Sequence, residues 1–275
     1  MNLPCIASQS ASHPDAEEAI LVDHVITPRA QPIDETVGAP FDARQAARDL
    51  LRTSRMAALA TLDTTSGYPY GTMTNLSVEP QGMPVFYAAG LSLHARNILA
   101  EPRISLTLAQ VSGLDVLNER RLTLVGRALP MEGADLAAAR ARYRRRFPKA
   151  ATYTALKDAR FFRVEVEGLH LNGGPARNTD ALRPDDLRID LTGAEDLMRH
   201  EEEEIARINA DKRLIGPLSE RAGGVRGRWK VTTIDPEGLD LAGEAAVARI
   251  WLPQRITSRA GLHAWIASVG GPTRV

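Results

Sequence analysis

The sequence predicts a mainly β fold of the α+β class: an antiparallel barrel with flanking helices, followed by a small α+β domain. Three observations support this prediction. Short β-type runs alternate with polar turns over residues 59–171. Few long helices interrupt these runs, which favours a closed antiparallel barrel over a parallel sheet. After residue 190 the pattern changes, and short strands lie between amphipathic helices.

The bulk composition excludes several classes of function. The chain has 275 residues, with 34 Lys+Arg and 34 Asp+Glu, so its formal net charge is +0. This balance gives no overall attraction to nucleic acid or to an anionic membrane. A hydrophobic content of 44% is sufficient for packed cores. Cys5 is the single cysteine, so one chain forms neither a disulfide nor a cysteine-based metal site, and we expect no metal.

The first segment, residues 1–40, is predicted to be a flexible extension. It is rich in Ala, Ser, Pro and acidic residues and has no apolar period. It lacks the basic-then-apolar layout of a secretion signal, and no run in the chain is apolar enough to span a bilayer. We therefore expect a cytoplasmic protein without nucleic-acid or membrane partners.

Residues 41–190 are predicted to form the barrel domain. Its first helix begins after Asp42, whose spacing to Gln45 resembles a capping box. A polar turn at 63–67 and a tight turn at 79–82 connect the first predicted strands. The predicted strands are 59–62, 70–78, 83–88, 103–109, 121–129 and 161–171.

A longer helix is predicted over 135–147. Its apolar stripe consists of Leu136, Ala139, Tyr143 and Phe147. The helix also carries five arginines within 140–146. Helical spacing spreads them around the axis and no aromatic residues suited to base stacking accompany them, so we interpret them as a solvated face.

Residues 178–188 are predicted to be a linker, and 191–275 a small α+β domain. Thr192 and Glu195 resemble a second capping box, before a helix with Leu197, Ile205 and Ile208. Glutamates 201–204 diverge around that helix and cannot converge on one cation, so they predict a charged surface. Strands are expected at 231–234, 239–241 and 247–252. The last helix has Leu262, Trp265, Ile266 and Val269 on one face.

The stretch 82–108 holds the best candidate for a binding site. An apolar run ends in small residues, and a short helix begins at Ser92 and ends before Pro102. His94 and Arg96 lie in its first turn, where unpaired N–H groups and the positive end of the helix dipole are found. This pattern predicts an anion site, most simply for phosphate. A plain helix cap with solvated His94 and Arg96 is the alternative that the residues alone leave open.

Together these motifs resemble the pyridoxamine 5'-phosphate oxidase-like flavoproteins, the FMN-binding split barrels, and most closely their haem-utilisation branch. His94 and Asn97 match the His and Asn of that branch. The other matching segments are the strand opening at 67–69, the run 119–126 that ends in glycine, and the late strand with its double-glycine turn at 168–176. The resemblance covers 41–190, and a weaker one continues to the C-terminus, including the turn at 234–238.

The resemblance implies that FMN lies between two barrels, and hence a homodimer. It assigns cofactor binding to Thr72, Met73, Thr74, Asn75, Ser77, Tyr87, Ala88, Ser92, His94, Arg96, Asn97 and Arg121. Leu93 and His94 replace an Arg-Lys pair of the classical oxidase, so His94 and Arg96 must supply the positive charge. Phosphate binding would then depend on protonation of His94. Arg121 matches a Gln that contacts the flavin, with a salt bridge at the rim as its alternative.

The leading hypothesis is an FMN-dependent oxidoreductase acting on an unknown small molecule, with catalytic residues unassigned. The residues that grip pyridoxal phosphate in the classical oxidase are not recognisable here. Haem binding or degradation by the same fold is the alternative, with His170, His200 or His263 as the axial ligand. His200 matches the first His of a motif whose second His is missing here, which disfavours haem in the C-terminal domain. A non-catalytic regulatory binding protein is the third hypothesis.

Overall fold

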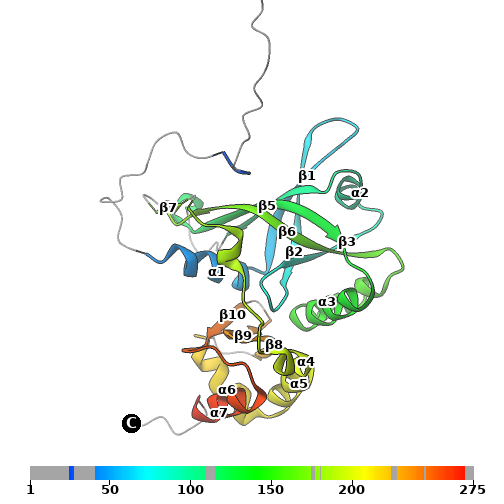
Figure 1. Cartoon of the computed structure of the whole chain (residues 1–275). Coiled ribbons are helices and arrows are strands. Elements are labelled where there is room, and N and C mark those ends of the chain that lie inside the picture. Colours follow the sequence, from blue (N-terminus) through cyan, green and yellow to red (C-terminus); the bar gives the residue numbers. More distant parts are fainter. Residues whose placement is uncertain are drawn as a thin grey trace, which may run out of the picture.

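The centre of the structure is a closed antiparallel barrel. The structure is a computed structural model, and it describes residues 25–27, 41–109, 115–174, 177–179, 181–223, 228–244 and 246–269. The strands follow the order β3-β2-β1-β4-β5-β6, and pairing of β3 with β6 closes the ring (Figure 1). The strands are β1 (Met56–Leu62), β2 (Pro69–Val78), β3 (Pro84–Ala89), β4 (Arg103–Ala109), β5 (Arg121–Pro130) and β6 (Ala159–Asn172). The predicted fold class is confirmed.

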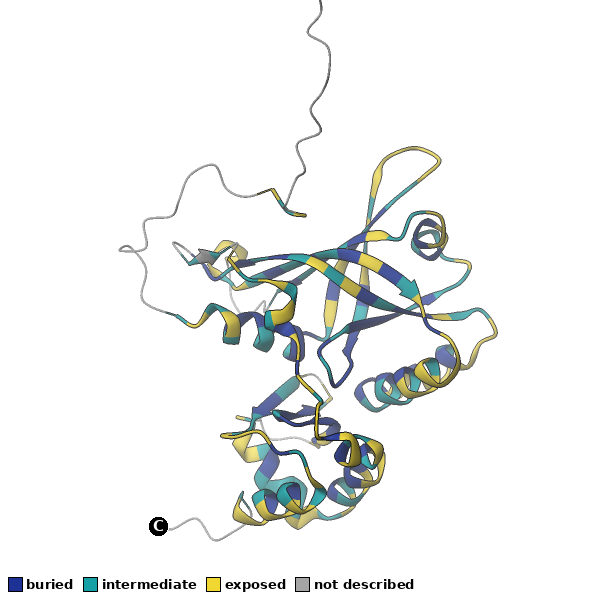
Figure 2. Ribbon diagram, viewed as in Figure 1, coloured by how far each residue is buried: buried dark blue, intermediate teal, exposed yellow. Residues whose placement is uncertain are grey.

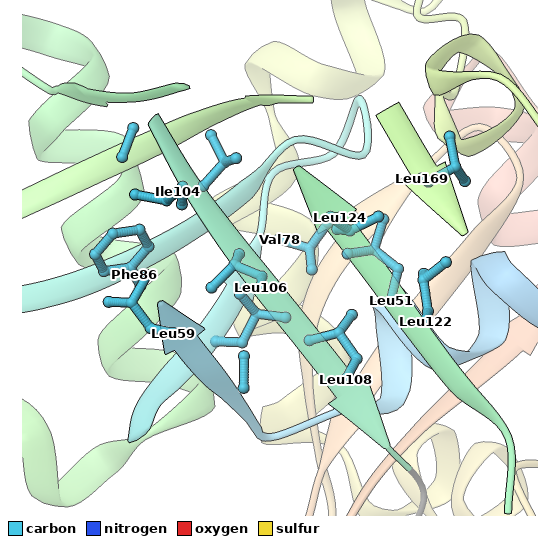
Figure 3. Packing of buried hydrophobic residues seen from close by; sticks show 14 of the residues in the cluster. Leu51, Leu59, Val78, Phe86, Ile104, Leu106, Leu108, Leu122, Leu124 and Leu169 are labelled. Atoms are coloured by element: carbon cyan, nitrogen blue, oxygen red, sulfur yellow. The ribbon is translucent and has the colours of Figure 1, made fainter. Parts of the chain in front are cut away.

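The inward face of each strand fills the barrel, as the two-residue period of a strand requires. Phe86 and Phe162 stack with their ring centroids 5.4 Å apart. Leucines and other apolar side chains from β1, β4 and β5 pack beside Phe86 (Figure 3). Gly126 lies at a bulge between β5 and β6, where an added Cβ would come 1.9 Å from the carbonyl oxygen of Glu165. Figure 2 shows the buried strand interiors and, in contrast, the exposed tip of the β1–β2 hairpin.

Three helices accompany the barrel: α1 (Ala43–Thr53), α2 (Leu93–Ala100) and α3 (Gly133–Arg146). Asp42 caps α1 by accepting a hydrogen bond from the Gln45 N–H at 2.9 Å. The Gln45 side chain binds Asp49 instead of returning to Asp42, so only half of the predicted capping box forms. Short 3-10 turns lie at Val116–Asn118, Pro148–Ala151 and Tyr153–Ala155.

The C-terminal unit has its own sheet and its own hydrophobic core. Its strands, in the order β10-β9-β8, are β8 (Lys230–Asp235), β9 (Gly238–Ala242) and β10 (Val247–Trp251). Its helices are α4 (Glu195–Arg199), α5 (Glu201–Ala210), α6 (Lys212–Arg221) and α7 (Arg259–Val269). Leu197, Ile205, Ile208, Leu262 and Ile266 meet in its core, as their helical spacing predicts.

The sequence misplaced the start of this unit's first helix. Thr192 does not cap it: Ala194 is the N-cap residue, and the Glu195 carboxylate accepts from the Gly193 N–H instead. The helix ends at Arg199, and α5 begins only after His200. Helix α6 was not predicted, because Pro217 lies within it. Among the described residues no helix has both the length and the apolar character needed to cross a bilayer.

The structure describes most of the predicted linker 178–188 but little of the predicted extension 1–40. The predicted linker 178–188 is attached to the barrel, because β7 (Asn178–Thr179) pairs with β6 and Leu187 is only 4% exposed in the barrel core. That interpretation was therefore wrong. The predicted extension 1–40 lies outside the described residues except for 25–27, where Val25 and Ile26 lie against Gly168.

Helices α1 and α3 face the C-terminal unit (Figure 1), and opposite charges meet there. Arg142 donates to Glu201 at 2.7 Å. Arg146, only 3% exposed, donates to the carbonyl oxygens of Arg52 and Ser54. The interpretation of the arginine run as a solvated face was therefore wrong for Arg142 and Arg146. The interpretation of the glutamate run as a charged surface was likewise wrong for Glu201 and Glu204, which are buried and paired.

A buried ionic network joins the same two parts. Arg249 donates to both Asp235 and Asp240 at 2.8 Å. Arg52, from α1, lies 3.5 Å from Asp235 and 3.3 Å from Asp240, and donates to the Pro80 carbonyl at 2.6 Å. Each of the four charged side chains is at most 2% exposed. We call this set the buried network.

Candidate functional site

A cavity of about 380 Å³ lies where β2, β3, α3 and the N-terminus of α2 meet. We call it the tyrosine pocket. Its lining residues are Met73, Thr74, Asn75, Tyr87, Ala88, Ala89, Ser92, His94, Tyr143 and Tyr153. The fold therefore brings together residues of the two segments, 72–77 and 87–97, that the sequence singled out.

The N-terminus of α2 forms the polar corner of this pocket. The Ser92 hydroxyl donates to the Ala89 carbonyl at 2.7 Å and accepts from the Ala95 N–H at 3.3 Å. Its one proton is thus used, so the contact of 3.2 Å to His94 Nε2 requires that Nε2 be the donor. In the neutral ring Nδ1 is then an acceptor. The first-turn N–H groups of Leu93 and His94 have no acceptor within the helix.

Burial controls the charge of this corner. It lowers the pKa of His94, so the imidazole of the empty pocket is neutral near pH 7. Among the described residues no Arg or Lys lines the pocket. An anion here would therefore meet N–H groups and the helix dipole, and would favour proton uptake by His94.

Three phenols surround the other side of the pocket. The Tyr143 and Tyr153 hydroxyls lie 3.5 Å apart, and the Asn75 amide donates to Tyr153 Oη at 3.5 Å. The Tyr87 and Tyr153 rings are 4.9 Å apart between centroids. Burial raises the pKa of Tyr143, with a further contribution from its hydrogen bond to Tyr153, and burial also raises the pKa of Tyr87. Tyr87 and Tyr143 therefore stay protonated at neutral pH, and the three rings offer a planar ligand aromatic faces and hydroxyl groups.

Some predicted site residues lie in strand β2 or on α2 without lining the tyrosine pocket. Thr72 pairs with Leu59 in the β1–β2 ladder, and Ser77 is buried in β2. Asn97 is buried too, and its Nδ2 donates to Thr61 Oγ1 at 3.1 Å. None of these three side chains lines the tyrosine pocket.

The two predicted arginines also lie outside the lining. Arg96 is exposed. Its charge acts on Asp63 in the β1–β2 turn, whose pKa is lowered mainly by hydrogen bonds from Thr65 and Ser66 and slightly by Arg96. Arg121, at the start of β5, donates to the carbonyl oxygens of Val116 and Glu119.

The sequence missed Ala89, Tyr143 and Tyr153 as pocket residues. Tyr143 was predicted as part of the apolar stripe of α3, and it does lie in a core, only 1% exposed. Tyr153 belongs to a 3-10 turn that no periodicity marks. The sequence signal that could have identified them is the grouping of tyrosines. The chain has only 5 tyrosines, and two of them lie on either side of the end of α3.

The histidines proposed as haem ligands lie elsewhere. His200 Nδ1 bonds the Asp196 carbonyl at 2.9 Å, and His263 Nε2 bonds Glu204 at 2.9 Å. His170 lies in β6, paired with Thr123. Among the described residues His94 is the only imidazole that lines the tyrosine pocket.

A second cavity, of about 610 Å³, lies between the barrel and the C-terminal unit. It shares Asn75 and Tyr153 with the tyrosine pocket. We call it the basic cavity, because five cationic side chains and one carboxylate line it. These are Arg55, Arg145, Lys149, Arg228 and Lys230, and Glu244.

Known proteins resemble this chain over the barrel and beyond it. Residues 43–173 match the pyridoxamine 5'-phosphate oxidase family. A crystal structure of a protein of unknown function from Agrobacterium tumefaciens is 48% identical, with a TM-score of 0.79, and the match covers 89% of this chain and 98% of that one. A heme binding protein from Mycobacterium smegmatis is 26% identical, with a TM-score of 0.51, over 85% of this chain and 98% of that one.

A curated plant relative matches a shorter segment. The chloroplastic non-canonical heme oxygenase HOZ of Arabidopsis thaliana is 32% identical over 114 residues, which is 40% of this chain. The match covers 33% of the plant protein, so this chain spans about a third of the curated relative's length.

Proposed function

Residues 43–173 belong to the pyridoxamine 5'-phosphate oxidase family, and on that premise we propose that this chain is an FMN-dependent oxidoreductase acting on a small molecule. The observation that carries the proposal is the meeting of the α2 N-terminus, Ser92 and His94 with a tyrosine-lined cavity. When bound, FMN would supply hydride and electron transfer through its ring.

The residues of the tyrosine pocket fit the two ends of FMN differently. The free N–H groups of Leu93 and His94 suit a phosphate at a helix N-terminus, and the Ser92 hydroxyl caps that terminus by accepting from the Ala95 N–H. The end of β3 at Tyr87 and Ala88 suits the edge of the flavin ring. Asn75 and the phenol of Tyr153 supply polar groups for its carbonyls and nitrogens.

We also propose that two copies form a homodimer over this pocket. The outward face of β1 carries small uncharged residues: Ala58 pairs with Met73 and Thr107, and Ala60 pairs with Gly71 and Ser105. Met73 is 58% exposed at the rim of the pocket, so a second copy on this face would close it. Arg121 is then the candidate contact to the flavin of the other copy.

Light scattering of two variants tests the dimer. Ala60→Glu places an unpaired carboxylate in the proposed interface, and it should give a monomer with weakened FMN binding. Ala100→Glu, at an exposed position on α2, should remain dimeric. A wild-type monomer at micromolar concentration that still binds FMN would contradict the dimer.

Titration with FMN and riboflavin, followed by flavin fluorescence, tests the cofactor. FMN should bind at least about tenfold more tightly, because only FMN carries the phosphate. Ser92→Ala should lower the affinity for FMN by about two- to tenfold, because the Ser92 hydroxyl holds the first turn of α2 and the His94 ring in place. FMN should bind more tightly at pH 6 than at pH 8, since the phosphate raises the pKa of His94 and the ring gains a proton.

The matched histidine controls complete this experiment. His94→Gln should remove the pH dependence, whereas His200→Gln should keep it. If FMN and riboflavin bind equally well to the wild type, the corner at Ser92 is not a phosphate site.

Haem is the second candidate, favoured by the position of His94 in the pocket and by the likeness to a heme binding protein. His is the most frequent axial ligand of haem, and His94 is the imidazole that the described lining of the pocket offers. A saturable Soret band that His94→Ala abolishes and His200→Ala retains would support haem over FMN.

A further inference from the structure

Most cations of the basic cavity have no carboxylate partner in the part of the chain that the structure describes. Across the described residues, no carboxylate lies within ion-pair distance of Lys149, Arg228 or Lys230, which are all exposed. The Arg55 guanidinium donates to the Gly243 carbonyl at 3.2 Å and lies over the Phe147 ring. Arg145 is the exception, because it forms two long ion pairs, with Glu201 at 3.9 Å and with Glu202 at 3.8 Å.

This arrangement costs energy when the cavity holds only water. Cationic side chains from both parts of the chain surround one cavity, and among the residues that the structure describes Glu244 is the only carboxylate in its lining. Like charges around a concave site with protein walls produce a positive potential that attracts anions. A volume of about 610 Å³ is suited to a small organic molecule and too large for a single phosphate.

The basic cavity and the tyrosine pocket are neighbours. Asn75 and Tyr153 line both, and the Asn75 amide donates to the Tyr153 hydroxyl at 3.5 Å. A molecule that fills the basic cavity therefore touches the pair that also faces the proposed flavin.

We propose that the basic cavity binds the anionic end of the substrate, a molecule with two or more carboxylate or phosphate charges, and directs its reacting end past Asn75 and Tyr153. The part about the reacting end rests on the proposed function, because it needs a flavin in the tyrosine pocket. Anion binding itself does not. Because Arg228 and Lys230 belong to the C-terminal unit, that unit takes part in substrate binding.

Calorimetric titration of the full chain with inorganic pyrophosphate, and separately with citrate, tests the site. Saturable binding of pyrophosphate alone indicates a phosphate substrate, and of citrate alone a carboxylate substrate. Lys230→Gln and Arg228→Gln should each lower the affinity for the probe that binds by about five- to tenfold. Lys212→Gln removes a lysine that is also exposed but lies outside the cavity, and it should change the affinity less than twofold. No saturable binding of either probe, or an equal loss in the Lys212 variant, would overturn the proposal.

FMN titration in the presence of the saturating probe separates this proposal from the proposed function. FMN should bind with unchanged affinity, and the probe should shift the flavin absorbance because Asn75 and Tyr153 are shared. If the probe competes with FMN, the two bind one anion site and the substrate assignment is wrong. If FMN never binds but the probe does, the proposed function fails while the anion site stands.

Discussion

The buried network and the basic cavity lie at the same contact between the barrel and the C-terminal unit, yet they treat charge in opposite ways. In the buried network Arg52 and Arg249 have lost their water and are matched by two aspartates. In the basic cavity Lys149 and Lys230 keep their water and face no acid within ion-pair distance in the described parts of the chain.

This difference teaches how to separate structural charges from functional ones in this fold. A charge that is desolvated must be paired, because an uncompensated buried ion costs several kcal/mol. A charge left unpaired at a cavity adds nothing to folding, and its use is to bind something from outside. The buried network therefore holds the two parts in place, and the basic cavity uses the space that this placement creates.

The largest effect on stability should come from breaking the buried network. Asp240→Asn leaves Arg249 and Arg52 with half of their counter-charge, and should lower the free energy of unfolding by about 3–5 kcal/mol in urea titrations. Asp211→Asn breaks the exposed pair with Arg213, and should leave the unfolding midpoint nearly unchanged. Equal effects in the two variants would show that burial does not distinguish these pairs.

A smaller effect is expected at Glu204, a buried carboxylate whose partners are partly exposed. Burial would raise its pKa, but hydrogen bonds from Arg207, His263 and Arg259 outweigh this and lower it to about 2. Its contribution to stability is therefore complete above its unfolded pKa of 4.5 and is lost as pH falls towards about 2.

Glu204→Gln tests that contribution. It should cost about 1–3 kcal/mol at pH 7, and should flatten the loss of stability between about pH 5 and pH 2. Glu202→Gln, on the exposed side of α5, is the control. If stability falls between about pH 5 and pH 2 as steeply in the Glu204 variant as in the wild type, other groups cause this loss.

The smallest effect on stability should come from the basic cavity. Lys230→Gln and Arg228→Gln should not lower the unfolding midpoint, because within the described ranges these exposed side chains have no carboxylate partner to lose. A slight rise is expected where like-charge repulsion is relieved. A clear drop would mean that these cations have a structural role, and the contrast with the buried network would fail.

The sequence predicts the barrel far better than it predicts the contact between the barrel and the C-terminal unit. Alternation and turn residues place β1–β6 and α2 within a few residues, because local patterns determine them. The arginine run of α3 and the glutamate run of α5 were both interpreted as surface. Their partners lie about sixty positions apart in sequence, and nothing local reveals that Arg142 meets Glu201.

The same limit applies to the two cavities. The polar corner at Ser92 and His94 follows from one short motif, so the sequence could predict it. Tyr153 and Lys230 become neighbours of Asn75 only through tertiary packing, and the basic cavity exists only once the C-terminal unit is in place.

A crystal structure of the full chain grown with both FMN and inorganic pyrophosphate separates the roles of the two cavities in one measurement. The flavin should lie against Tyr87 with its phosphate at Ser92 and His94, and pyrophosphate should lie between Lys149 and Lys230. Pyrophosphate at Ser92, with the basic cavity empty, or a flavin phosphate held by Lys230, would contradict this assignment.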